Sequence, residues 1–342
     1  MKLVLLSPQY FPTRGGVPVL VDLLGRAFER VGHSVSVLTS EESPNVGVGG
    51  CFSPLVRPRL GELLRLLRSS DAVISLQECL SLTWPLALGL VRRPTLVFLQ
   101  MHPQAASGLR AWPKLFLRRR LFGSSVVCAC SEYVAADVRK SEGIAVKVVH
   151  NPYDHEVFHC RGDEVRDIDI LYVGRLAIHK RCDVLLQAVA IREKADDRLA
   201  VVVAGDGPEE DTLKKLAADL GLKDCRFVGP VTAAEAADLM RRARTFVVPS
   251  GYEPFGIVVL EGLACGCCVV ASDAGGLREA GSGFTETFRL NDVEDLADQL
   301  SNAGCHASDG SNLKSWLERQ RPAHVAARLL DQLAAITQLR AH

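Results

Sequence analysis

Residues 245–261 read TFVVPSGYEPFGIVVLE and contain the signals of a strand, a turn and a helix in succession. The β-branched run 245–248 predicts a buried strand, and the turn residues 249–251 end it. The apolar run 256–264 then predicts a helix. Ligands of open parallel sheets bind beyond the carboxyl ends of the strands. The loop between this strand and this helix is therefore the first candidate for a binding site.

Two glutamates in this stretch have the character of site residues. Glu253 precedes Pro254, which favours extended backbone and places the glutamate in the loop. Free N–H groups at residues 255–257 would favour an anion at the helix start. Glu261 stands among apolar helix residues, where an unpaired carboxylate is costly. We therefore expect its carboxylate either to accept hydrogen bonds from a vicinal diol, such as that of a ribose, or to form a salt bridge with a neighbouring helix.

Three more predicted strands deliver polar or glycine-rich loops to the same edge. Strand 168–173 precedes Gly174-Arg175 and Lys180, two cations that suit a phosphate or diphosphate, or that are solvated surface charges. Strand 199–204 precedes GDGP at 205–208. This is not a dinucleotide fingerprint, because Glu210 stands where a third glycine is needed. Strand 268–271 precedes Gly275-Gly276, which would let backbone approach a ligand.

Strands alternate with helices on both sides of a polar segment at 151–167, which predicts two doubly wound α/β domains with parallel sheets. The expected division is 1–165 for an N-terminal Rossmann-like domain, 166–311 for a C-terminal Rossmann-like domain, and 312–342 for a last helix that returns to the N-terminal domain. Further strands are expected at 3–6, 34–38, 72–76, 95–101, 126–129, 146–149 and 226–228. Helices are expected at 19–31, 80–91, 113–122, 132–142, 182–194, 209–220, 233–242, 293–300 and 312–339, the last one kinked at Pro322.

Composition excludes several classes of protein. The chain has 342 residues, enough for two cores at roughly 150 residues per domain. Forty basic and forty acidic side chains cancel, so no net charge attracts nucleic acid. Residues 1–165 nevertheless carry +5 and the remainder −5. Eleven cysteines lack zinc-finger spacing and are expected to be small core residues. The first apolar run is too short for a signal peptide, so a cytoplasmic protein is expected.

Taken together, these motifs resemble the retaining glycosyltransferases of the GT-B fold, glycosyltransferase family 4, also called glycosyl transferases group 1. The resemblance rests on Gly174-Arg175-Leu176 with Lys180, GDGP at 205–208, the spacing of Glu253 and Glu261, and Gly275-Gly276 with Glu279. It covers nearly the whole chain and is dense from 168 to 296. Arg181 stands where the family usually has Gly, and Cys267-Cys268 and Arg278 stand where Pro is common, which weakens any subfamily assignment.

The resemblance implies a role for each matching residue. Arg175 and Lys180 would bind the donor diphosphate, Glu253 the donor sugar, and Glu261 the nucleotide ribose. In the N-terminal domain, Gly16 would lie near the phosphates, and His102 would lie near the transferred sugar unless it is a structural histidine. The catalytic set is thus Glu253, His102, Arg175 and Lys180. The donor-binding set is Gly16, Gly205, Asp206, Val228, Gly229, Phe255, Gly256, Ile257, Val258 and Glu261.

The implied function is a retaining hexosyl transfer from a UDP- or GDP-sugar to an acceptor hydroxyl. It needs no divalent metal, no other cofactor and no protein general base. The alternative is a catalytically inert protein that binds a nucleotide sugar on the same fold. A nicotinamide oxidoreductase is disfavoured by the missing third glycine. The acceptor is not identified, and its selection is expected from loops 41–58 and 103–112.

Three other short motifs occur in or next to the predicted linker. HEVFH at 155–159 matches the H-E-x-x-H zinc motif but lies in the predicted linker rather than on a helix. DID at 167–169 precedes its strand, at the wrong sheet edge for a catalytic metal. RGD at 161–163 is taken as chance.

The segment 113–122 carries basic side chains beside apolar ones. A solvated helix face is the ordinary explanation. Weak peripheral contact with an anionic membrane, at its inner face, is the alternative, through Lys114, Arg118, Arg119 and Arg120.

Overall fold

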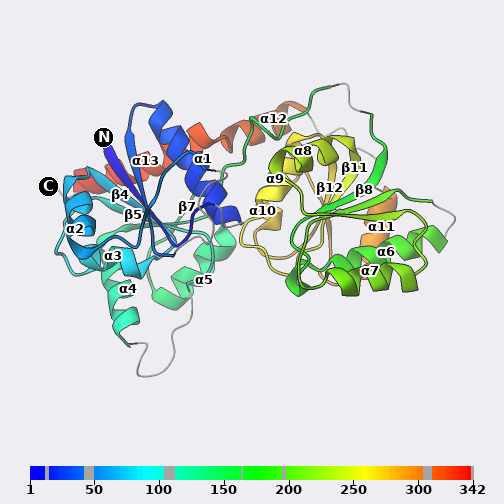
Figure 1. The fold of residues 1–342 in the computed structure, drawn as a ribbon, viewed down its shortest axis with the longest axis horizontal. Coiled ribbons are helices and arrows are strands. Elements are labelled where there is room, and N and C mark those ends of the chain that lie inside the picture. The colour runs from blue at the N-terminus through cyan, green and yellow to red at the C-terminus, as the bar shows by residue number, and fades with distance from the viewer. Residues whose placement is uncertain are drawn as a thin grey trace. The chain divides into compact units, whose positions relative to one another are not determined.

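The structure is a computed structural model that describes residues 1–11, 15–41, 50–103, 112–162, 165–194, 198–302 and 310–339. The chain divides into two compact units. Unit 1 contains Met1–Pro152 and Gln320–His342, and unit 2 contains Tyr153–Arg319. The first division lies earlier than the expected 165, because Tyr153 and Phe158 are buried with the part of the chain that follows them. Figure 1 shows both units as ribbons.

Unit 1 is built on a seven-stranded sheet in the order β3-β2-β1-β4-β5-β6-β7, and every pair of neighbours is parallel. Its strands are β1 (Lys2–Ser7), β2 (Ser34–Thr39), β3 (Leu55–Val56), β4 (Ala72–Leu76), β5 (Thr95–Leu99), β6 (Val126–Ala129) and β7 (Lys147–Val148). Its helices are α1 (Gly16–Arg30), α2 (Leu60–Ser69), α3 (Leu80–Ala87), α4 (Trp112–Ser124), α5 (Glu132–Glu142) and α13 (Pro322–Leu339).

Unit 2 is built on a six-stranded parallel sheet in the order β10-β9-β8-β11-β12-β13. Its strands are β8 (Ile168–Val173), β9 (Val201–Ala204), β10 (Cys225–Gly229), β11 (Ala243–Val248), β12 (Cys268–Ser272) and β13 (Glu286–Phe288). Its helices are α6 (Cys182–Lys194), α7 (Glu210–Asp219), α8 (Ala233–Arg242), α9 (Ile257–Ala264), α10 (Leu277–Gly281), α11 (Val293–Asn302) and α12 (Gly310–Arg319), with a 3₁₀ turn η2 (Ile178–Lys180).

Helices cover both faces of the unit 2 sheet (Figure 1). One layer contains α6, α7 and α11, whose apolar side chains share a core with inward residues of β8 and β9. The other layer contains α8, α9 and α10, which contact one another in sequence order. The predicted fold class, two doubly wound α/β domains with parallel sheets, is confirmed.

Local sequence explains where several elements begin and end. The hydroxyl of Thr232 accepts a hydrogen bond from the backbone N–H of Glu235 at 3.3 Å, and the Glu235 carboxylate accepts one from the N–H of Thr232 at 2.7 Å, so α8 starts at a capping box. Helix α5 begins after Ser131, whose hydroxyl accepts a hydrogen bond from the Val134 N–H, and it ends at Gly143, where φ is 67°.

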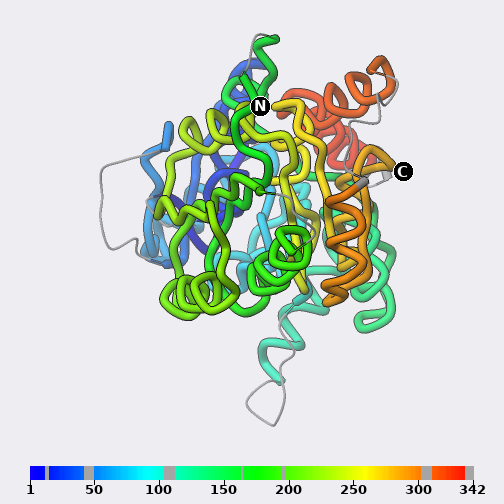
Figure 2. Tube along the Cα trace, turned by 90° about the vertical axis from the view of Figure 1, so that its right-hand side faces the viewer, coloured from blue at the N-terminus to red at the C-terminus, as the bar shows by residue number. Residues whose placement is uncertain are grey.

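The last predicted helix differs from the structure. The range 312–339 is expected to be one kinked helix, but it forms two helices, α12 and α13. Proline has no N–H for the preceding turn, and its fixed φ suits the first position of a helix, so the second helix starts at Pro322. Figure 2 follows this end of the chain, in orange and red. Within unit 1, α13 packs against α1 and against β5 and β6.

Candidate functional site

Four neighbouring strands of unit 2 end at one edge of the sheet and carry the predicted site loops there. The sheet order places β9, β8, β11 and β12 side by side, all parallel. Their carboxyl ends lead into residues 174–180, 205–208, 249–256 and 273–276. The sequence therefore brings these loops together, as expected for a doubly wound sheet.

The loops after β8 and β9 are packed backbone against backbone. The N–H of Gly174 donates to the carbonyl oxygen of Ala204 at 3.0 Å, and the N–H of Leu176 donates to that of Asp206 at 2.8 Å. A Cβ on Gly205, whose φ is 138°, would lie 1.9 Å from the Gly174 carbonyl oxygen. A Cβ on Gly207 would lie 2.2 Å from the Leu176 carbonyl oxygen. Glycine is required here for close approach of protein backbone.

The loops after β11 and β12 are joined in the same way. The N–H of Gly276 donates to the carbonyl oxygen of Glu253 at 2.9 Å. A Cβ on Gly275 would lie 2.1 Å from that same oxygen. The glycine pair thus fixes the backbone at Glu253.

The Glu253 carboxylate forms an ion pair with the ammonium of Lys180, and both side chains are mostly buried, with 17% and 23% of their surface exposed. Lys180 is the last residue of η2. The neighbouring His179 carbonyl oxygen accepts the Gly251 N–H at 2.7 Å, which ties η2 to the Glu253 loop. Burial and the charge of Lys180 lower the pKa of His179.

Arg175 is the available cation of the site. Its side chain is exposed and forms no ion pair with any residue that the structure describes. Its backbone is held by buried Tyr172, whose hydroxyl donates to the Arg175 carbonyl oxygen at 2.9 Å. The loop is thus anchored while the guanidinium stays accessible to an anion.

Arg181 stands where the resembled family usually has glycine, and the backbone conformation at this position accounts for that preference. Its φ is 53°, in the left-handed region that favours glycine. Its guanidinium bonds to both carboxylate oxygens of Asp183, at 3.0 and 2.9 Å. A residue with a side chain therefore occupies a conformation for which the family's usual glycine is suited.

Glu261 lies on α9, and burial raises its pKa to about 8, with a further contribution from the negative charge of Asp154. A carboxyl with this pKa holds a proton near neutral pH until a ligand or cation stabilises its charge. The alternative expected for Glu261, a salt bridge to a neighbouring helix, is not among the ion pairs of the described residues.

The start of α9 is the position at which the sequence predicts an anion-binding helix N-terminus. Gly256 precedes the first helical residue with φ 97°, and no side chain caps the helix. Phe255 is buried, whereas Ile257 and Val258 are partly exposed. The first-turn N–H groups are consequently without a capping side chain.

Four further residues of the donor-binding set, Gly205, Asp206, Val228 and Gly229, lie at the ends of the neighbouring strands β9 and β10. Val228 is 47% exposed, an unusual state for an apolar strand residue. The Gly229 carbonyl oxygen accepts the Gly205 N–H at 2.7 Å, and the Asp206 side chain is exposed. Val228 thus offers an apolar surface next to the glycine loop.

Two predicted site residues belong to unit 1. Gly16 is the first residue of α1 and is exposed, and a Cβ built on it meets no atom within 4 Å. His102 follows β5, and its Nδ1 lies 2.8 Å from a carboxylate oxygen of Asp137. The Tyr133 ring packs edge-on against the imidazole at a centroid distance of 5.1 Å.

Sequence reasoning missed several neighbours of the predicted residues. Tyr133 and Asp137 are four positions apart on α5 and therefore share the helix face that holds His102. That spacing is visible in the sequence, but its pairing with His102 is a tertiary contact. Tyr172 lies only three positions before Arg175, so that contact is local, whereas Asp154 has no local signal that links it to Glu261.

The structure corrects the predicted membrane contact at Arg118. Its guanidinium is 5% exposed and pairs with Glu78 at 2.5 Å and Glu142 at 3.2 Å. It cannot also face a membrane, whereas Lys114, Arg119 and Arg120 are exposed. Among the described helices, none has the length and apolarity needed to cross a membrane.

The competing motifs also have defined places. His155 to Phe158 form a turn rather than a helix, so HEVFH does not present two histidines on one helical face. Asp167 bonds to Arg242 at 2.8 and 2.6 Å, and Asp169 accepts the Ala200 N–H at 2.9 Å. Asp163 of the RGD sequence lies outside the described residues, as do parts of both predicted acceptor loops. The described part of the chain holds no cluster of three metal-ligating side chains.

Comparison with known proteins places both halves of the chain in one family. Residues 14–157 match Glycosyltransferase Family 4, and residues 161–303 match Glycosyl transferases group 1. A D-inositol 3-phosphate glycosyltransferase of Frankia alni is 46% identical over 127 residues, which are 34% of this chain and 31% of that protein. The alignment therefore spans about a third of the relative's length.

Solved structures with the same fold cover the whole chain. The sucrose-phosphate synthase of Thermosynechococcus elongatus has a TM-score of 0.70 at 20% identity and covers 99% of this chain and 98% of its own. HepE of Anabaena in complex with UDP has a TM-score of 0.73 at 18% identity, with coverage of 100% and 98%.

Proposed function

Because the chain belongs to the glycosyl transferases group 1, glycosyltransferase family 4, we propose that it transfers a sugar, with retention of anomeric configuration, from a nucleoside diphosphate sugar to an acceptor hydroxyl. The single observation that supports this most is the ion pair of Lys180 with Glu253 beside the exposed Arg175, at the edge where four strand ends converge. A diphosphate binds cations, and a carboxylate accepts hydrogen bonds from sugar hydroxyls, so this set of side chains suits both parts of the donor.

In the proposed reaction the anomeric carbon exchanges its bond to the diphosphate oxygen for a bond to the acceptor oxygen on the same face. The departing phosphate oxygen takes the acceptor proton. Arg175 and Lys180 stabilise the charge that grows on the leaving diphosphate, the electrostatic contribution that is usually the largest in such sites. This scheme uses no metal ion and no protein general base.

Glu253 and Glu261 hold the two sugars of the donor. Donor diphosphate would compete with Glu253 for Lys180, which frees the carboxylate to accept hydrogen bonds from hydroxyls of the transferred sugar. Glu261 accepts the ribose hydroxyls, and Val228 and Gly229 border the base. From unit 1, Gly16 donates its backbone N–H to the phosphates and His102 contacts the transferred sugar.

The base of the donor is proposed as uracil or guanine. HepE, which shares the fold, is known in complex with UDP. A thermal-shift panel of UDP- and GDP-sugars identifies the donor, because a ligand that binds only the native state raises its stability by mass action.

The test of the site uses three variants and one control. Glu253→Gln should reduce turnover at least a hundredfold while nucleoside diphosphate binding falls less than about fivefold. Arg175→Ala and Lys180→Ala should weaken both. The control is Lys215→Ala, an exposed lysine on α7 that removes the same charge away from the loops.

Two results would count against this function. Turnover near wild type in all three site variants would overturn the assignment of residues. Tight nucleotide-sugar binding with neither transfer nor donor hydrolysis would favour the inert binding protein instead.

A further inference from the structure

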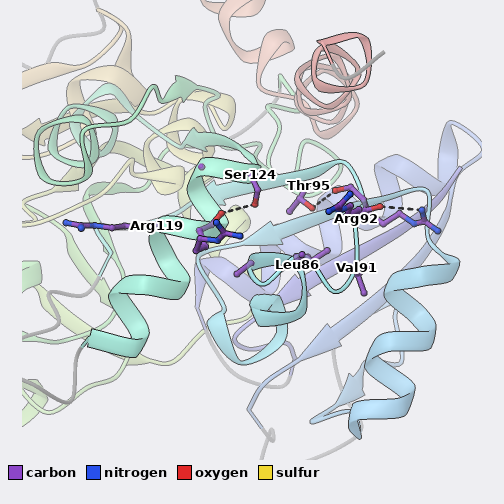
Figure 3. A pocket seen from close by; sticks show the side chains of 11 residues that line it. Leu86, Val91, Arg92, Thr95, Arg119 and Ser124 are labelled. Carbon is purple, nitrogen blue, oxygen red and sulfur yellow. Dashed lines mark hydrogen bonds between the residues drawn. The ribbon is translucent and has the colours of Figure 1, made fainter. Parts of the chain in front are cut away.

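A cavity of about 630 Å³ lies in unit 1, and none of the predicted catalytic or donor-binding residues lines it (Figure 3). It is formed by the end of α3, the turn that follows it, the start of β5 and the last turns of α4. Thr95, which lines it, is the first residue of β5, whereas His102 follows the carboxyl end of that strand. The cavity therefore lies at the edge of the sheet opposite His102. Its polar lining residues are Arg92, Arg93, Thr95, Arg119, Arg120 and Ser124.

The lining is strongly cationic. No Asp or Glu occurs in the sequence between Glu78 and Glu132, and Glu78 is already paired with Arg118. None of the four arginines of the cavity pairs with a carboxylate in the part of the chain that the structure describes. Their charge is therefore left without a protein counter-ion, which favours an anion.

Arg93 is the most constrained of the four. Its guanidinium donates to the carbonyl oxygens of Arg68 and Arg92, groups that carry no full negative charge. Its Nε is buried without an acceptor among the described residues. Figure 3 shows Arg92 close to Thr95, whereas the Arg119 side chain extends away from them. Arg92, Arg93 and Arg120 are thus the cations we expect to matter most.

The surface around the cavity exposes large apolar side chains. Leu88 and Leu90 are 44% and 52% exposed and alternate with the lining residues Gly89 and Val91. Earlier on α4, outside the cavity lining, Trp112 is 71% exposed and stacks on the 43% exposed Phe116, with ring centroids 5.9 Å apart.

The aromatic pair and the cavity belong to the same side of α4. Trp112, Phe116 and Arg120 follow one another at four-residue spacing and therefore share one face of the helix. A free anion would not need exposed apolar side chains beside its site. A helix face that carries an arginine one turn after Phe116 and two turns after Trp112, with exposed leucines beside the cavity, suits a membrane surface, where aromatic rings sit at headgroup level and cations meet anionic lipids.

We propose that this cavity binds the phosphate of an anionic phospholipid headgroup, with Trp112, Phe116, Leu88 and Leu90 inserted in the interface beside it. The proposal replaces the contact expected from the sequence, since Arg118 faces inward and Arg92 and Arg93, far from α4 in the sequence, supply charge instead. It does not depend on sugar transfer.

The experiment is co-sedimentation of the full chain with phosphatidylcholine vesicles that either contain or lack phosphatidylglycerol. The wild type should bind the anionic vesicles and bind weakly to phosphatidylcholine alone. Arg92→Gln with Arg120→Gln should lower the partition coefficient at least about tenfold, because each basic residue near an anionic surface contributes roughly fivefold. Trp112→Ala with Phe116→Ala should lower it several-fold even at high salt, which screens only the charges.

The matched control is Lys140→Gln with Lys147→Gln, which removes the same charge from exposed positions of unit 1 outside the cavity. It should bind like the wild type. An equal loss in the control, or no binding of the wild type to anionic vesicles, overturns the proposal. A separate thermal-shift titration uses inorganic phosphate without vesicles. Phosphate stabilisation that requires Arg92 and Arg120, together with absent vesicle binding, would show a soluble phosphate site and also overturn it.

These measurements are made without a sugar donor. Each variant is first checked for wild-type circular dichroism and melting temperature. Failure of vesicle binding therefore leaves the proposed transferase activity standing, and loss of transferase activity leaves this proposal standing.

Discussion

At the scale of single residues, Glu261 should make the stability of unit 2 depend on pH. Its folded pKa of about 8 lies above the ordinary value of a glutamate, so between about pH 5 and pH 8 the native state holds more protons than the unfolded state. Stability from this group is therefore complete at low pH and falls as pH rises through that window. The unfolding free energy of Glu261→Gln, which cannot ionise, should rise relative to that of the wild type by on the order of 4 kcal/mol between pH 5 and pH 9.

Urea denaturation of both proteins at pH 5, 7 and 9 measures this difference. A gap that is constant with pH would show that Glu261 titrates normally. Added nucleoside diphosphate should stabilise the wild type and not the variant if the carboxylate holds a ribose.

Asp137 should position His102 rather than contact the donor. Its carboxylate is 2.8 Å from Nδ1 and is half exposed, and it fixes which face of the imidazole is presented. Asp137→Asn should lower kcat about tenfold with little change in nucleotide affinity, while Asp137→Glu should restore part of the rate. Steady-state kinetics with calorimetric binding separate the two effects. An equal loss of affinity would indicate a structural role for the pair.

The sequence predicts residue identities at the site better than it predicts their partners. Glu253, Lys180 and Arg175 could be selected because each follows a strand that is recognisable from its β-branched residues. That Glu253 and Lys180 form an ion pair depends on η2 and the turn to Gly251, which bring distant parts of the chain together. No local pattern encodes such a contact.

At the scale of elements, the loop after β9 should tolerate no side chain. Gly205→Ala would place Cβ against the Gly174 carbonyl oxygen and would occupy φ 138°, so we expect a loss of about 2–4 kcal/mol in unfolding free energy. Gly221→Ala is the control, because Gly221 also has a positive φ of 71° but faces open space, and it should cost about 1 kcal/mol. Thermal and urea denaturation compare them. Equal losses would show that conformation alone, not loop packing, sets the cost.

Helix α4 is held by a charged contact that is costly to break. Arg118→Met would leave Glu78 and Glu142 without their shared cation in a buried setting, and should destabilise unit 1 by about 3–5 kcal/mol. Burial already raises the pKa of Glu78 despite Arg118, so the loss should shrink as pH falls and the carboxyls take up protons. Denaturation at pH 5 and 8 checks this, with exposed Arg119→Met as a control near zero. A pH-independent loss would point to packing alone.

The elements that were not predicted have physical explanations. Helix α2 follows a stretch treated as an acceptor loop, and its start at Arg59-Leu60 lacks the usual capping residue, although Glu62 bonds back to the Arg59 N–H at 3.0 Å. Strands β3 and β13 are too short to show periodicity, since they have two and three residues. They are defined by pairing with β2 and β12.

At the scale of the whole molecule, the two units should respond differently to a nucleotide. The proposed donor loops lie in unit 2, so a nucleoside diphosphate at a hundred times its Kd should stabilise that unit by about 2.7 kcal/mol. Hydrogen exchange can assign the effect, with protection expected mainly in 153–319. Arg175→Ala with Lys180→Ala should abolish it. Uniform protection of both units would instead indicate that they unfold together.

The order of the segments along the chain lets unit 2 be completed before unit 1 during synthesis. Unit 2 is one continuous insertion, whereas unit 1 needs α13, whose residues Val325, Leu329 and Leu333 are buried against the rest of that unit. Of the two units, the one whose synthesis begins earlier is consequently the one that is completed later. Until residues 320–339 emerge, the side of α1 that packs against α13 is uncovered while unit 2 can already fold. Apolar surface exposed in this interval should make the nascent chain prone to aggregation.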